Sequence, residues 1–221
     1  MATRAPLSRE RVLRTAIDLA DKSGVEAVTM RRLGQALGVE AMSLYHYVAS
    51  KDDVLDGIVD VVVSEIEAPP EEGDWRAAIR ARALSAHVVL RRHPWAPRLI
   101  ATRTTMSAAM LRHMDAVMGD LRRGGLSDAL AHHGMHVLGS RVLGFTQELF
   151  DSADLGPGVA AILGGEGEAA GYPSIAAVLA SVRHDEDAEF EFGLDLILDG
   201  LERSRVQPPG GGASISASRS W

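Results

Sequence analysis

The side chains of Thr29–Lys51 are the ones whose types and spacing point to a particular chemistry. Arg31 can donate two hydrogen bonds to a guanine edge, or it can bind a phosphate. Lys51 follows Ser50 at the expected start of a helix, where free backbone N–H groups also favour a phosphate. The run 45–47 reads Tyr-His-Tyr, and all three side chains can hydrogen-bond to phosphates or to base edges. These residue types together indicate recognition of double-stranded DNA.

Two short helices must position these side chains. The spacing predicts one helix over Met30–Leu37, capped by Thr29 and closed by Gly38, and a second over roughly Ala41–Tyr47. Two helices joined by a glycine-containing turn form a helix-turn-helix. The apolar side chains that can be buried together, and so fix the crossing of the two helices, are Leu33, Leu37, Val39, Leu44 and Val48.

The outward side of the second helix is predicted to lie in the major groove of DNA. Ala41, Met42 and Ser43 are at its N-terminal end, where small and apolar side chains can meet base edges and thymine methyl groups. Half-buried packing is the alternative role for Tyr45 and Tyr47. The complete set of expected DNA-contacting residues is Thr29, Arg31, Ala41, Met42, Ser43, Tyr45, His46, Tyr47 and Lys51.

Helical periodicity continues along most of the chain, and no strand pattern or internal repeat occurs in the sequence. The sequence therefore predicts an all-α protein, with a helix-turn-helix domain and linking helix over 1–67, a helical domain over 68–206 and a disordered tail over 207–221. A loop is expected over Asp151–Tyr172. The other expected helices are Ser8–Lys22, Ser50–Glu67, Asp74–Arg92, Trp95–Arg103, Met106–Arg123, Ser127–Phe150, Ser174–Arg183 and Ala188–Arg205.

Composition narrows the possible classes of protein. The 221 residues are 46% hydrophobic and contain no cysteine, which excludes a wholly disordered chain and a disulfide scaffold. The net charge of −7 divides into +3 over residues 1–51 and −10 over the rest. This asymmetry is typical of a protein of which only one end contacts phosphates. The sequence has neither an apolar run long enough to span a membrane nor a signal-peptide pattern, so we expect a cytoplasmic protein.

Leu7–Ile66 resembles the DNA-binding domain of the tetracycline-repressor (TetR) family of bacterial transcription regulators. The residues that carry the resemblance are Gly24-Val-Glu-Ala-Val-Thr-Met-Arg-Arg-Leu33, Leu37-Gly-Val39, Ser43-Leu-Tyr-His-Tyr-Val48 and Lys51. The resemblance implies a homodimer whose two probe helices read a palindromic operator. It also implies a transcriptional repressor that a small molecule releases from DNA.

The C-terminal half is similar, more loosely, to the drug-binding domain of that family, through Trp75, Arg92-His93, Gly125-Leu-Ser127, Leu138-Gly139 and Phe190–Glu202. In the tetracycline repressors a His and a Glu help to hold a magnesium–tetracycline chelate. Alignment places these positions on Ile100 and near Leu143, and an aliphatic side chain cannot bind a hard cation. We therefore expect an inducer other than magnesium–tetracycline. The expected ligand contacts are Arg82, Ala86, Ile100, Arg103, Met110 and Met114.

The two arginines in this set have two possible roles. They favour an acidic or polyoxygenated ligand if they face the cavity, and otherwise they belong to a solvated face or to a domain-interface salt bridge. Met106, Met110, Met114 and Met118 step by four along one expected helix, as core packing or as an adaptable pocket wall. His132, His133 and His136 lack the acidic partner of a zinc motif, so neither a metal site nor a cofactor is expected.

The apolar stripe near the C-terminus is either an intrachain core or half of a dimer four-helix bundle. The sequence analysis assigns it to the dimer, with an interface of Leu138, Val142, Leu194, Ile197, Leu198 and Leu201. The function predicted is a ligand-responsive repressor that binds operator DNA as a homodimer. The alternatives are a DNA-binding regulator without a small ligand and a small all-α enzyme, for which no nucleophile, P-loop or dinucleotide motif is found.

Overall fold

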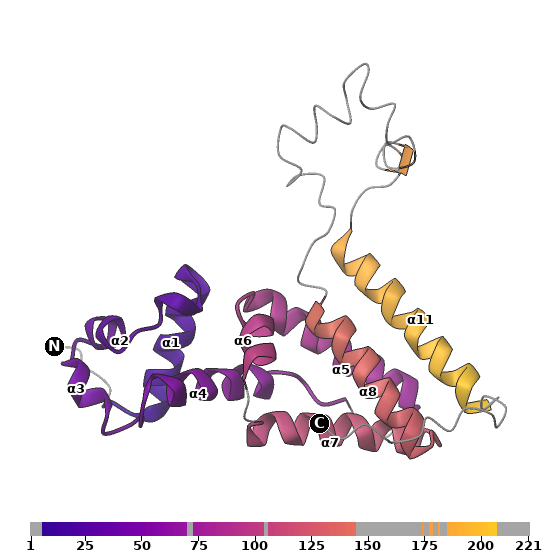
Figure 1. Cartoon of the computed structure of the whole chain (residues 1–221), viewed down its shortest axis with the longest axis horizontal. Coiled ribbons are helices and arrows are strands. Elements are labelled where there is room, and N and C mark those ends of the chain that lie inside the picture. The colour runs from indigo at the N-terminus through magenta and orange to yellow at the C-terminus, as the bar shows by residue number, and fades with distance from the viewer. Residues whose placement is uncertain are drawn as a thin grey trace, which may run out of the picture.

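The computed structural model describes residues 6–69, 73–103, 106–144, 174, 177–178, 181 and 185–206. Every regular element in these residues is a helix (Figure 1), as predicted. The predicted loop at 151–172, the last residues of the helix predicted to end at Phe150, most of the helix predicted at 174–183 and the tail at 207–221 lie outside the described residues.

The N-terminal helices begin and end at the predicted caps. Helix α1, Arg9–Ser23, begins after Ser8, whose side chain accepts a hydrogen bond from the Arg11 amide, and ends at Gly24. The short helix η1, Val25–Ala27, leads to α2, Met30–Leu37. Thr29 accepts from the Arg32 amide, and Gly38 ends α2 in the left-handed conformation with φ 64°. A glycine adopts this conformation without the steric cost that a Cβ would bring.

The probe helix is shorter than predicted. Helix α3 covers Ala41–Leu44 only, and residues 45–47 form turns instead of the predicted last helical turn. The Tyr47 amide bonds to the Leu44 carbonyl at 2.9 Å, which is the i→i−3 pattern of a tightened turn. Val48 is buried, and its side chain must return to the core immediately after this turn. The correction does not change which residues lie on the outer side of α3.

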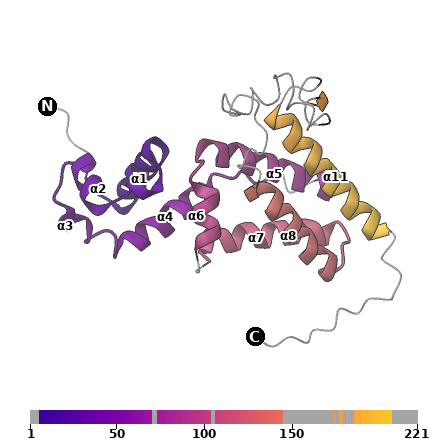
Figure 2. The same cartoon turned by 45° about the horizontal axis from the view of Figure 1, so that its top comes forward.

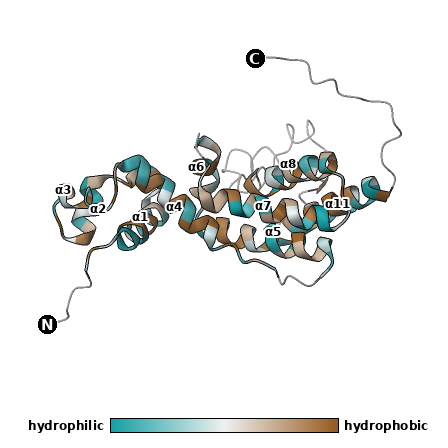
Figure 3. Ribbon diagram, turned by 90° about the horizontal axis from the view of Figure 1, so that it is seen from below, coloured by the Kyte–Doolittle hydropathy of each residue, from teal (hydrophilic) through white to brown (hydrophobic). Residues whose placement is uncertain are grey.

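Helix α4, Lys51–Ser64, links the helix-turn-helix to the body of the protein. Ser50 caps it by accepting from the Asp53 amide at 3.1 Å, as predicted, but the helix ends three residues before the predicted Glu67. Apolar residues follow one another along α4 (Figure 3), where it runs from the N-terminal helices into the body. Val54, Ile58 and Val62 are fully buried, so both halves of the molecule pack on this one rod.

The body consists of α5, Trp75–Arg92; α6, Ala96–Thr102; α7, Ala108–Arg123; α8, Asp128–Gly144; and α11, Glu186–Val206. Each lies close to its predicted range. Helices α5, α7, α8 and α11 pack on one another away from the N-terminal helices (Figure 2), and their core includes Phe190 and Leu121. A second core joins α1–α4 to the end of α5, to α6 and to the start of α7.

A ladder of ion pairs holds α11 antiparallel to α5. Its contacts are Arg76 with Asp199, Arg80 with Asp195 at 3.0 Å and with Glu191 at 2.6 Å, His87 with Asp187 at 3.1 Å, and Arg91 with Asp187 at 2.7 Å and with Glu186 at 3.2 Å. The His87 ring also stacks on Phe190, with 4.0 Å between the ring centroids. Polar and apolar contacts thus fix the same helix pair.

The predicted dimer stripe needs a correction. Leu138, Leu194, Leu198 and Leu201 are buried within this single chain, where they pack against α5 and α7. Val142 and Ile197 are half-buried and pack against the same core. The side of α11 that points away from this core instead exposes 68% of Phe192 and 54% of Leu196. The four buried leucines therefore belong to the chain's own core, and a role of Val142 and Ile197 in a dimer interface stays a prediction.

Candidate functional site

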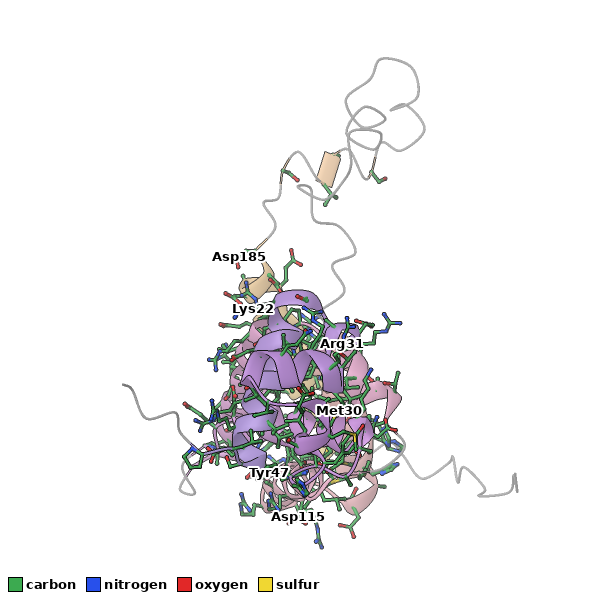
Figure 4. The ribbon with its side chains drawn as sticks, turned by 90° about the vertical axis from the view of Figure 1, so that its left-hand side faces the viewer. Lys22, Met30, Arg31, Tyr47, Asp115 and Asp185 are labelled. Carbon is green, nitrogen blue, oxygen red and sulfur yellow. The ribbon has the colours of Figure 1, made fainter. Side chains whose placement is uncertain are left out.

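The outer face of the helix-turn-helix exposes the residues that the sequence assigns to DNA. Met42 is 74% exposed, Tyr45 and Tyr47 are also exposed, and so are Arg31, His46 and Lys51. Thr29, Ala41 and Ser43 are half-buried. Figure 4 looks directly onto this end of the molecule, with Arg31 and Tyr47 labelled. Six of the nine expected DNA-contacting residues are therefore exposed to solvent, and the other three are partly exposed.

The close crossing of α2 and α3 depends on Gly34, which the sequence analysis did not single out. A Cβ at this position would lie 2.8 Å from the Val39 carbonyl oxygen and 3.1 Å from the Ala41 amide nitrogen. Both neighbours are backbone atoms and cannot rotate away. A glycine inside an otherwise regular helix was the available signal.

An ion pair fixes the start of α4 beneath Lys51. Arg9 of α1 donates two hydrogen bonds to Asp53, at 2.7 and 2.8 Å, and the Ala49 amide donates to the same carboxylate at 2.7 Å. The hydrogen bond from Arg9 is the main reason why the pKa of Asp53 is below its ordinary value. The carboxylate stays ionised and holds the α4 terminus against α1. The pair joins residues 44 positions apart, so sequence spacing alone could not indicate it.

A polar junction joins the DNA-binding end to the body. Asp21 of α1 accepts from Trp95 Nε1 at 2.6 Å and lies 2.8 Å from His93 Nδ1. The other ring nitrogen of His93 lies 3.4 Å from Glu65, which follows α4 and also pairs with Arg92 at 3.0 Å. His93 and Trp95 are both buried. Helix α1, the end of α4 and the corner between α5 and α6 therefore meet at one network.

A cavity of about 960 Å³ lies between α4, α5, α6, α7 and α8. Its wall is mainly aliphatic and includes five methionines, of which Met106, Met118 and Met135 lie beyond the six expected contacts. All six residues that the sequence assigns to a ligand, namely Arg82, Ala86, Ile100, Arg103, Met110 and Met114, line this cavity. Leu143 lines it as well. Its volume suits a drug-sized molecule.

Both predicted arginines line the cavity and are also held in ion pairs. Arg82 Nη2 lies 3.2 Å from Asp120, a carboxylate that is only 2% exposed and that also binds Arg123. Arg103 pairs with Asp52 at 3.3 Å and with Asp56 at 2.5 Å, both on α4. The two roles left open for these arginines therefore coexist, since each is a salt-bridge partner and part of the wall.

Three histidines line the cavity too. His132 and His136, one helical turn apart on α8, approach with their ring centroids 4.6 Å apart. His113 of α7 was not among the expected contacts. Burial lowers its pKa, and the positive charge of Arg82 lowers it further. His113 is therefore a neutral polar group near pH 7 in an otherwise apolar wall.

Comparison with known proteins agrees with this architecture. Residues 12–58 match the family model of bacterial regulatory proteins of the tetR family, and residues 68–205 match that of the tetracyclin repressor-like C-terminal domain. The chain belongs to the TetR family. It is 34% identical over 212 residues to the HTH-type transcriptional repressor DrrR1 of Streptomyces coeruleorubidus, covering 89% of this chain and 77% of that protein.

Two further relatives are similar over most of their length. HTH-type transcriptional repressor Rv1353c of Mycobacterium tuberculosis is 30% identical over 215 residues, which is 89% of this chain and 80% of that protein. The chain is also similar to ActR of Streptomyces coelicolor in its crystal structure with actinorhodin. The two sequences are 30% identical, and the structures match with a TM-score of 0.72 over 91% of this chain and 99% of ActR. The TetR-family protein described here is thus a DNA-binding transcription regulator with an all-helical body. No helix in its described residues is long and apolar enough to cross a membrane.

Proposed function

We propose that this TetR-family regulator is a repressor that binds a palindromic operator as a homodimer, and that a small molecule in the α4–α8 cavity releases it. In this proposal residues 1–67 bind DNA and residues 68–206 bind the second copy. The ligand binds to residues 68–206 together with the part of α4 that lines the cavity. The observation that carries the proposal is that one helix serves both sites. Helix α4 begins at Lys51 on the DNA-facing end, and Asp56, Val59, Val62 and Val63 of the same helix line the cavity.

Movement of α4 links the two sites. A dimer reads two half-sites roughly 34–36 Å apart, so a small rotation of each N-terminal domain removes the match to the operator. A ligand that contacts Arg82, Ile100, Arg103 and Met114 occupies a cavity that α4 also lines, and Arg103 is ion-paired to α4. A rigid helix displaced at one end moves at the other. By linkage, operator DNA must then weaken ligand binding by the same factor.

The ligand proposed is not magnesium–tetracycline. Ile100 and Leu143, at the aligned positions of the magnesium-binding His and Glu, both line the cavity and offer no ligand atom to a hard cation. The structure of ActR in complex with actinorhodin supports a small organic molecule as the ligand of a similar body.

The second copy is proposed to bind the outer face of α8 and α11. Phe192 and Leu196 supply an exposed apolar strip on α11, and Val137 on α8 is 48% exposed. A helix pair with such a strip can form a four-helix bundle with its symmetry mate. This face replaces the buried leucines of the predicted interface.

The test is binding of the full-length protein to labelled DNA from upstream of its own gene, followed by fluorescence anisotropy and footprinting. We expect the footprint to show a symmetric protected site. We also expect a compound from a cell extract of the producing organism to abolish this protection. Symmetric binding that no compound in the extract affects favours the second candidate, a DNA-binding regulator without a small ligand. Absence of specific binding to any genomic fragment contradicts both.

A further inference from the structure

Arg103 connects the cavity wall to the linking helix. It follows α6, its side chain is 20% exposed, and it lines the cavity. Its Nη1 lies 3.3 Å from Asp52 Oδ1, and its Nη2 lies 2.5 Å from Asp56 Oδ1. The two carboxylates occupy the first two turns of α4, directly after Lys51. One guanidinium therefore joins the wall of the ligand site to the DNA-facing end of α4.

The same guanidinium has a donor without an acceptor in the described part of the chain. Arg103 Nε is buried and has no hydrogen-bond partner among the described residues. A buried N–H without an acceptor is unfavourable, because it has lost its water without gaining another bond. An oxygen atom of a molecule in the cavity can accept this hydrogen bond.

The charges around the cavity favour an anion. Among the described lining residues, Asp56 is the single Asp or Glu, and Arg103 neutralises it. Arg82 and Arg98 line the same cavity, and the Asp120 that holds Arg82 is shared with Arg123. With all partners counted, four arginines, namely Arg82, Arg98, Arg103 and Arg123, face the three carboxylates of Asp52, Asp56 and Asp120, which leaves one net positive charge beside a mainly apolar wall. A carboxylate or similar oxygen anion binds a guanidinium through charge-assisted hydrogen bonds.

We propose that the ligand is a bulky, mainly apolar molecule with an acidic oxygen group, and that this group competes with Asp52 and Asp56 for Arg103. The inference rests on the proposed function, since it concerns the ligand of the same cavity. Capture of Arg103 breaks its tie to α4. It also leaves the charges of Asp52 and Asp56 uncompensated next to Lys51, where they repel the DNA backbone. The ligand class and the release of DNA thus have one cause.

A matched pair of probes tests the ligand class. Anthracene-2-carboxylate and anthracene-2-carboxamide have nearly the same shape and differ in charge. Calorimetric titration of the full-length protein is expected to give about tenfold tighter binding of the carboxylate. Arg103→Gln removes this preference and leaves the affinity for the amide unchanged. Asp56→Asn, which removes a competitor, tightens the carboxylate severalfold.

Control variants separate this mechanism from its alternatives. Arg98→Gln removes another cation that lines the cavity from α6, so the preference must survive it. Arg103→Lys keeps the charge but lacks Nε–H, and it is expected to retain part of the preference. Met114→Trp fills the cavity and must weaken both probes. A preference that persists in Arg103→Gln, or disappears in Arg98→Gln, overturns the proposal.

The outcomes also separate the ligand class from the ligand site. Equal binding of both probes, abolished by Met114→Trp, refutes the acidic ligand and leaves the cavity as the ligand site. No binding of either probe refutes the cavity as a site for such molecules, while release of operator DNA by a compound from the extract still tests the ligand-dependent part of the proposed function on its own.

Discussion

Trp95 Nε1 donates a hydrogen bond to Asp21 Oδ1 at 2.6 Å, from the corner between α5 and α6 to helix α1 of the DNA-binding end. His93 Nδ1 lies 2.8 Å from the same oxygen. One carboxylate oxygen therefore serves two buried rings of the body. Since the backbone between these halves runs through α4, this contact is a second, independent connection between them.

Removal of that carboxylate is expected to destabilise the protein. Asp21→Ala leaves the indole N–H of Trp95 and a ring nitrogen of His93 without their partner, at a cost of about 1–3 kcal/mol in the free energy of unfolding. Urea denaturation followed by tryptophan fluorescence measures it. Asp18→Ala, an exposed position on the same helix, is the control and is expected to stay within about 0.5 kcal/mol of wild type. Equal midpoints for the two variants would show that the junction contributes nothing to stability.

The proposed dimer face makes a position-specific prediction along α11. Leu196→Asp puts a charge on the exposed strip, and it is expected to yield folded monomers or much weaker dimers in sedimentation equilibrium. Leu194→Asp puts the same charge into the chain's own core and is expected to unfold the body. Val88→Asp, on an exposed position of α5, is the control. A Leu196→Asp protein that still sediments as a stable dimer would move the interface to another face.

We expect two kinds of DNA contact: contacts to phosphates, which position the protein, and contacts to bases, which determine sequence preference. Lys51→Ala and Tyr47→Phe should weaken binding to all sequences alike, and Lys51→Ala should reduce the salt slope by about one. Met42→Ala should instead change the preferred base at one position, by about 1–3 kcal/mol. Anisotropy titrations at several salt concentrations with operator variants measure both. A changed base preference in Lys51→Ala, with the salt slope intact, contradicts this division.

Acid is expected to weaken the tie between α1 and α4. The hydrogen bond from Arg9 lowers the pKa of Asp53, so the folded state favours the ionised carboxylate. The stability that this pair contributes is complete above the unfolded-state pKa of about 3.9, and it is lost as the pH falls through the lower folded-state value. Thermal melting from pH 6 to pH 2 is expected to show a smaller loss of Tm for Asp53→Asn than for wild type. Parallel curves for the two proteins would contradict the role of the pair.

Local signals in the sequence were sufficient for most of the fold. Ser8, Thr29 and Ser50 cap helices as predicted. Each side-chain oxygen accepts from an amide only three residues further on, so the signal is contained in the local sequence. The end of α3 was predicted wrongly, because the amides of Tyr45 and Tyr47 bond three residues back rather than four, a local tightening that apolar spacing does not reveal. Similarly, the stripe on α11 has helical periodicity whether its partner is α5 or a second chain.

For the functional residues, too, local features could be predicted from the sequence and long-range contacts could not. Exposure of Met42 and Tyr45 follows from the pattern of a short amphipathic helix, and the structure places them accordingly. The partners of Arg82 and Arg103 could not be predicted, because Asp120 and Asp56 lie 38 and 47 positions away in the chain and become neighbours only through helix packing. The resemblance to the family indicated which positions line a cavity, but it carried no information about these ion pairs.

The stacking of His87 on Phe190 determines where the outer strip of α11 lies. The buried leucines of α11 recur at nearly every turn, so a slip by one helical turn, about 5.4 Å, would exchange one leucine for the next at little cost. The acidic partners of α5 recur at a similar spacing, at Asp187, Glu191, Asp195 and Asp199, so most ion pairs could form again after such a slip. The stack could not, because the slip moves Phe190 away from the His87 ring. One aromatic contact thus fixes the height at which Phe192 and Leu196 face outward.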